Sequence, residues 1–188
     1  CEEVAVEETG PVRAAVRIAG RLGDDAGNRF GRFVCRLWAW AGCPLLSLSS
    51  RVFQETDERV AMVDDLLLEV GTALREELRG GFSVDTVQRP LPDGQVREWE
   101  LRQADPDRYS IYGKRFDEIE AGEHAEGWAN LEGTRDGRPG GLAAGVRWFW
   151  QQAPKTLTVS DQGLTLGLFQ RRKRDDWDLD SPLYLMTR

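Results

Sequence analysis

Apolar and polar side chains alternate with a period of two along most of this 188-residue chain. The alternation is plain after Gly10, where Val12, Ala14, Val16 and Ile18 share one parity. Successive side chains of a β-strand point to opposite faces of the sheet, so this spacing predicts strands with one buried face. Gly, Pro and Asp clusters separate the alternating segments and predict turns.

Many strands without long intervening helices predict two antiparallel sheets packed face to face. We therefore expect an all-β, two-sheet antiparallel β-sandwich with at most one or two short helices. A long strand is expected over 142–151, near the centre of a sheet. A hairpin is expected over 157–168, with its turn at 161–163.

Residues 60–79 fit two patterns. Val60, Val63 and Leu67 begin a series at helical spacing, but Leu66, Leu68 and Val70 also alternate as in a strand. Gly71 would interrupt a long helix. Because the surrounding segments read as strands, we expect a strand at about 62–71 and a short helical turn near 73–79.

The composition narrows the classes of partner. The net charge is −7, whereas a nucleic-acid-binding surface is broadly basic, so nucleic acid is not expected as a partner. No apolar run is long enough to span a bilayer, and no membrane partner is expected. The three cysteines have no zinc-site spacing, and neither a metal nor a cofactor is expected. The sequence does not fix the compartment.

His124 is the only histidine, and it lies between glutamates and glycines that indicate an exposed loop. Histidine is the usual side chain for proton transfer near neutral pH, which makes His124 a catalytic candidate. The alternative is an inert surface histidine.

The stretch 148–155, with Arg147 immediately before it, is the densest cluster of aromatic and polar side chains. Indole rings pack on sugar faces, and amides and cations bind hydroxyls and carboxylates. Trp150, Gln151 and Arg147 are therefore candidates for substrate binding, and Lys155 is a second catalytic candidate. Alternation would point Trp148 and Trp150 to one face and Phe149 to the other. The alternative is that these aromatic rings fill the core.

Tyr112 is a further substrate-binding candidate. It lies with Tyr109 beside Lys114 and Arg115, and a tyrosine next to a cation can act as a base in an elimination. Buried structural tyrosines are the alternative.

Several segments together resemble the central β-sandwich domain of exo-acting rhamnogalacturonan lyases and their relatives. The resemblance rests on Gly10-Pro11-Val12-Arg13-Ala14, Leu101-Arg102-Gln103, Gly127-Trp128 and, above all, Trp150-Gln151-Gln152-Ala153-Pro154-Lys155. It implies a sandwich domain over about 3–170 and an exposed tail or linker over 171–188. It also implies flanking domains in the same chain, an N-terminal barrel and a C-terminal α/α toroid.

The resemblance implies cleavage of an acidic, uronate-containing polysaccharide by β-elimination, with this domain helping to form the cleft and inactive alone. That reaction needs a cation at the uronate carboxylate, a base and an acid. The acidic segment 117–126 does not suit contact with a polyanion. A non-catalytic carbohydrate-binding or structural module remains the alternative.

Overall fold

The computed structural model describes residues 1–23, 27, 29–54, 60–63, 65–85, 87–91, 98–113, 117–170 and 183–186. The chain forms two compact units, Cys1–Val63 with Leu183–Arg188, and Asp64–Pro182. The resemblance implies a single sandwich over about 3–170, whereas the chain forms these two units.

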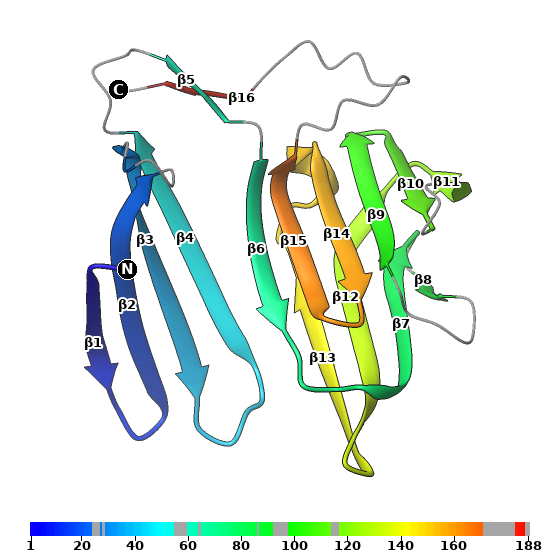
Figure 1. Cartoon of the computed structure of the whole chain (residues 1–188), viewed down its shortest axis with the longest axis horizontal. Coiled ribbons are helices and arrows are strands. Elements are labelled where there is room, and N and C mark those ends of the chain that lie inside the picture. Colours follow the sequence, from blue (N-terminus) through cyan, green and yellow to red (C-terminus); the bar gives the residue numbers. More distant parts are fainter. Residues whose placement is uncertain are drawn as a thin grey trace. The chain divides into compact units, whose positions relative to one another are not determined.

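The first unit contains a four-stranded antiparallel sheet in the order β1-β2-β3-β4 (Figure 1). Its strands are β1 (Glu3–Thr9), β2 (Arg13–Gly23), β3 (Arg29–Trp40) and β4 (Leu46–Gln54). The expected alternation is present, because Val16 lies opposite Leu37 while Arg17 lies opposite Arg36 on the other face. Arg36 pairs there with Glu7 at 2.7 Å.

A short antiparallel ribbon also belongs to the first unit. It pairs β5 (Val60–Val63) with β16 (Leu183–Met186). Four residues of the expected exposed tail thus form a strand, and the remainder of 171–188 lies outside the described residues.

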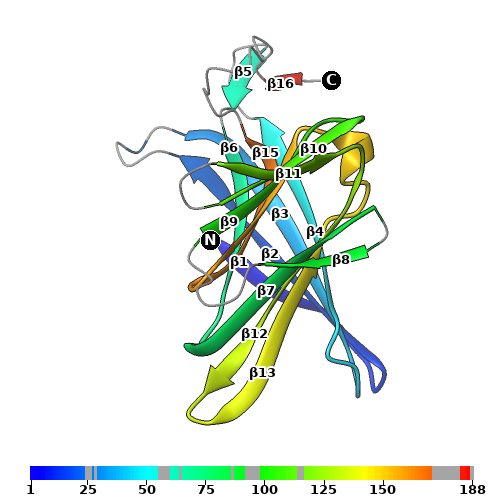
Figure 2. The ribbon, with the colours of Figure 1, turned by 90° about the vertical axis from the view of Figure 1, so that its right-hand side faces the viewer.

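The second unit contains two antiparallel sheets. The six-stranded sheet has the order β11 (Glu118–Gly122), β10 (Arg108–Tyr112), β9 (Glu98–Asp105), β14 (Lys155–Ser160), β15 (Gly163–Gln170) and β6 (Asp65–Gly71). The four-stranded sheet has the order β13 (Arg138–Gly145), β12 (Ala125–Arg135), β7 (Glu76–Val84) and β8 (Val87–Pro90), and Figure 2 shows these four strands side by side.

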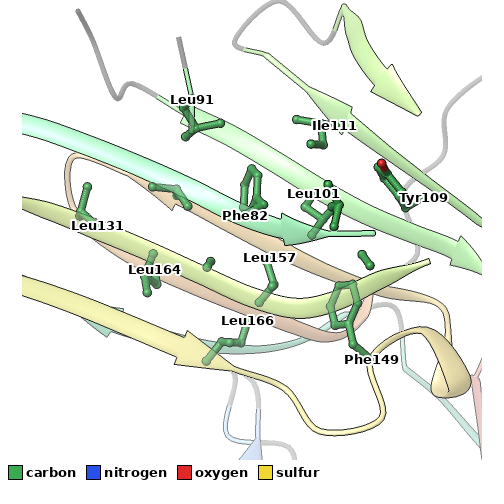
Figure 3. Close-up of a cluster of buried hydrophobic side chains, with 14 residues drawn as sticks. Phe82, Leu91, Leu101, Tyr109, Ile111, Leu131, Phe149, Leu157, Leu164 and Leu166 are labelled. Carbon is green, nitrogen blue, oxygen red and sulfur yellow. The ribbon is translucent and has the colours of Figure 1, made fainter. Parts of the chain in front are cut away.

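Apolar side chains from both sheets of the second unit form one core (Figure 3). Leu101 and Leu157 face it from the six-stranded sheet, and Phe82 and Leu131 face it from the four-stranded sheet. All four side chains are almost fully buried, which makes their removal from water the main stabilising contribution. The all-β sandwich that the sequence predicts is confirmed.

Two local predictions are wrong. The segment 73–79 is not a helical turn, because β7 begins at Glu76 and pairs with β12. The tryptophan-rich segment is not a central strand, because β13 ends at Gly145 and lies at the edge of its sheet. Trp148 has a φ of +59°, and Trp150–Gln152 form a single 3-10 turn, η1. Within the described ranges, no helix has the length and apolarity needed to cross a membrane.

Candidate functional site

One end of the second unit gathers most of the polar and aromatic candidates. Here β9 ends, β10 begins, β11 ends, and β12 and β14 begin, because neighbouring strands run antiparallel (Figure 1). Five residues lie at this end of the unit, and we call this set the aromatic end: Asp107, His124, Arg147, Trp148 and Trp150. These residues come from three separate turns.

The centre of the aromatic end is the contact between His124 and Trp150. Their ring centroids are 4.4 Å apart, with an angle of 34° between the ring planes. His124 Nε2 lies 3.7 Å from Asp107 Oδ1, and the two side chains are 41% and 90% exposed. The imidazole therefore has an indole on one side, and a carboxylate and solvent within reach.

Arg147 and Trp148 form the exposed part of the aromatic end. The Arg147 guanidinium lies 4.8 Å from the centroid of the Trp148 ring, a cation–π geometry. Trp148 is 52% exposed, and Gln151 is exposed beside it in the chain. Between Trp148 and Trp150, Phe149 is buried in the core. Alternation predicts that Trp148 and Trp150 lie on the same face of one strand. This prediction is wrong, because both residues lie in turns, and Trp148 is exposed whereas Trp150 is half-buried.

Gln103 joins the loops that carry Asp107 and His124. It is fully buried, and its side-chain amide donates to the carbonyl oxygens of Asp105 and Glu123, both at 2.9 Å. Its side-chain oxygen accepts from the backbone N–H of Ala125 at 2.9 Å. Because a buried amide satisfied in this way resists rearrangement, Gln103 holds the two loops together.

Lys155 lies at the same end but points into the protein. The residue is 8% exposed, and its Nζ donates to the carbonyl oxygen of Leu168 at 3.2 Å. Burial lowers the pKa of the ammonium group below its ordinary value. The catalytic role of Lys155 stays a prediction. In this structure its amine is hydrogen-bonded to the backbone of Leu168 inside the protein.

The predicted tyrosine site is divided between two faces of the six-stranded sheet. Tyr112 lies opposite Glu100, on the face away from the core, with the Arg102 guanidinium 4.9 Å from its ring centroid. Arg102 also forms a buried ion pair with Glu100. Tyr112 is thus not brought together with His124. Lys114 and Arg115 lie outside the described residues.

Tyr109 is surrounded by carboxylates rather than cations. Its hydroxyl lies 3.1 Å from Asp85 Oδ2 and 3.3 Å from Glu120 Oε1, and Arg89 Nε donates to the same Glu120 oxygen at 3.0 Å. Burial, followed by the hydrogen bonds and charges of the two carboxylates, raises the pKa of Tyr109. A phenolate base is therefore disfavoured at this position.

The aromatic end presents the exposed Trp148 ring and the Arg147 guanidinium, which are groups of the kind that contact sugar rings and carboxylates. Sequence reasoning found His124, Arg147 and Trp150 but missed Asp107 and Gln103, whose roles depend on which turns meet. In the part of the chain that is described, no group of three or more His, Cys, Asp or Glu side chains is placed to hold a metal ion. No protein-family model and no curated protein matches this chain.

Proposed function

We propose that this chain is the β-sandwich part of a multidomain polysaccharide lyase that cleaves an acidic, uronate-containing polysaccharide by β-elimination. The observation that supports this proposal is the aromatic end, where the Trp150–His124 ring contact lies in the same turn region as the exposed Arg147–Trp148 pair. Indole faces pack on sugar rings, and a guanidinium binds a carboxylate with charge-assisted hydrogen bonds. The sequence resemblance to rhamnogalacturonan lyases gives the proposed reaction.

In this proposal the chain contributes contacts to the substrate, and another domain completes the chemistry. β-Elimination needs a cation, a base and an acid at one uronate. Arg147 and His124 supply a cation and an imidazole, but the Lys155 amine is occupied by Leu168 and the Tyr109 hydroxyl by carboxylates. The isolated chain is therefore expected to bind without cleaving.

The test is a titration of the 188-residue chain with rhamnogalacturonan oligosaccharides, followed by tryptophan fluorescence and calorimetry. Arg147→Ala should weaken binding about tenfold, the value of one charge-assisted contact. Arg138→Ala is the matched control, because Arg138 is an exposed arginine at the opposite end of β13. Absence of binding by the unsubstituted chain, or equal binding by Arg147→Ala, would refute the proposal.

A non-catalytic sugar-binding module is the second candidate, and the buried Lys155 amine favours it. The two candidates differ in their product. A lyase forms an unsaturated uronate, which absorbs ultraviolet light, and a binding module forms no product. The longer protein that contains this sandwich should generate that absorbance if it is a lyase, and His124→Ala in the same protein tests whether the sandwich contributes to the chemistry.

A further inference from the structure

A second polar surface lies on the four-stranded sheet of the second unit, on the face turned away from the core. Along β12, Ala129 and Leu131 face the core, whereas Trp128 and Asn130 face outward. Trp128 lies opposite Ser83 of β7, which lies opposite Gln88 of β8. We call Ser83, Gln88, Glu126, Trp128 and Asn130 the amide face; its strands are seen side by side in Figure 2.

Trp128 lies flat on this face because its neighbour on β13 is a glycine. Trp128 is paired with Gly145, and a Cβ at Gly145 would stand 2.7–2.8 Å from three adjacent atoms of the indole. Three atoms at nearly equal distance mean that the ring covers the glycine face-on. One face of the indole therefore rests on the sheet, and the residue is still 53% exposed.

The amides of Gln88 and Asn130 meet above the strand that separates them. Gln88 Nε2 donates to Asn130 Oδ1 at 2.9 Å, although Gln88 is on β8 and Asn130 on β12. Gly81 of β7 lies beneath, and a Cβ there would stand 2.9 Å from the backbone oxygen of Arg89, 3.0 Å from Asn130 Oδ1 and 3.4 Å from Gln88 Nε2. Among the described residues this is the only hydrogen bond of either side-chain amide, so both keep donors and acceptors for a ligand.

None of the five side chains of the amide face is a cation. Glu126, whose Oε2 accepts from Ser83 Oγ at 3.2 Å, is the only charged residue of the set. Farther along the sheet Arg79 lies opposite Glu132, so these opposite charges sit side by side. The set therefore offers a uronate no charge-assisted contact of the kind that a guanidinium gives.

We propose that the amide face binds an uncharged oligosaccharide, with one pyranose ring stacked on Trp128 and its hydroxyls hydrogen-bonded to Asn130 and Gln88. A flat exposed indole beside side-chain amides matches a sugar ring, which has an apolar face and a polar rim. Gly145 and Gly81 let the indole and the amide pair lie close to the sheet, and Ala143, opposite Asn130, adds only a methyl group. The amide face shares no residue with the aromatic end of the proposed function.

The experiment is a titration of the 188-residue chain with cellohexaose, xylohexaose and a β-galactan hexamer, followed by calorimetry and by the indole N–H signals of an NMR spectrum. At least one of these probes should bind, and Trp128→Ala should weaken that binding about tenfold or more. Ile119→Ala is the control, because it removes a comparably exposed apolar side chain from β11, outside both proposed binding sets, and should leave the affinity unchanged.

Two glycine variants test the geometry while keeping every binding side chain. Gly145→Ala should displace the indole, and Gly81→Ala should separate the two amides, so each should weaken binding severalfold. Gly141→Ala is the matched control on β13, where a Cβ would make only ordinary contact, 3.5 Å from Glu132. Circular dichroism should show that all three variants are folded.

The outcomes separate this proposal from the proposed function. No binding of the uncharged probes, or equal binding by Trp128→Ala, would overturn the amide face whatever the acidic oligosaccharides do. Failure of rhamnogalacturonan to bind through Arg147 would overturn the proposed function and leave the amide face intact. Binding of a galacturonate oligomer that is lost in Trp128→Ala would overturn the choice of an uncharged ligand.

Discussion

At the scale of single residues, Lys155 is a buried charge at the same end of the second unit as the aromatic end. Its aliphatic stem follows Leu157 and Val159 along the core-facing side of β14, and its amine reaches the carbonyl oxygen of Leu168. Burying an ammonium group with one neutral partner costs free energy, and the lowered pKa expresses that cost.

This burial predicts a pH dependence of stability. Because the pKa of Lys155 is lower in the folded chain than its ordinary 10.5, the unfolded chain binds this proton more tightly. The free energy of unfolding should therefore rise as pH increases through the range between the lowered pKa and 10.5. In Lys155→Met this contribution should be missing. The measurement is urea denaturation of both proteins over that pH range, and a difference between them that stays constant with pH would contradict the prediction.

Residue identity alone indicated part of the candidate site. His124 was identified because it is the only histidine, and Arg147 and Trp150 because they lie in an aromatic cluster. The partners could not be predicted, because the Asp107–His124 and His124–Trp150 contacts join separate turns. Lys155 has the parity of Leu157 and Val159, so alternation does indicate that it points inward, and only its charge made it a catalytic candidate.

At the scale of elements, the turn between β13 and η1 depends on Gly127. Gly127 has a φ of +79°, and a Cβ there would stand 2.3 Å from Cβ of Phe149. The backbone N–H of Val146 donates to the Gly127 carbonyl oxygen at 2.9 Å. The glycine thus lets the chain turn inward and bury Phe149 immediately before Trp150.

Gly127→Ala should destabilise the protein by roughly 2–5 kcal/mol, combining left-handed backbone strain with overpacking against Phe149. Gly137→Ala is the matched control, because Gly137 also has a positive φ, of +72°, but a Cβ there would meet nothing within 4 Å. The control should lose only about 1–2 kcal/mol. Thermal and urea denaturation give both values, and equal losses would show that Phe149 adjusts without cost.

Alternation predicted most strands, since a sheet with one buried face imposes a period of two. The alternating segment from Val12 to Ile18 and the hairpin expected over 157–168 both lie largely in strands. It failed at 146–151, where Val146, Trp148 and Trp150 continue the pattern by parity alone. There the positive φ of Trp148 and the 3-10 turn end the strand, and nothing in local propensity indicates the packing of Phe149 on Gly127.

At the scale of the whole molecule, the two units differ in how much apolar surface they bury. Of the hydrophobic side chains that are described and buried, Ala15 is the only one in the first unit. Val4, Val6 and Leu46 of the same sheet are more than half exposed. Since apolar burial is the main favourable contribution to folding, the first unit should be the less stable of the two.

Amide hydrogen exchange tests this difference. Strands β3 and β14 are a matched pair, because each is paired on both sides within its own sheet. Amides of β14 should exchange at least about tenfold more slowly than those of β3 at neutral pH. Equal protection in the two strands would indicate that the units unfold together, despite their unequal cores.

The glycine beneath Trp128 also provides a criterion for tracing ancestry. Any side chain at position 145 would occupy the space of the Trp128 indole. The residues at positions 128 and 145 are therefore coupled through their pairing across two strands, although they are far apart in the sequence. The same holds for Gly81 beneath the Gln88–Asn130 bridge. In distant homologues, a tryptophan at the position of Trp128 should therefore occur together with a glycine at the position of Gly145. A pair of amides like Gln88 and Asn130 should likewise occur together with a glycine at the position of Gly81.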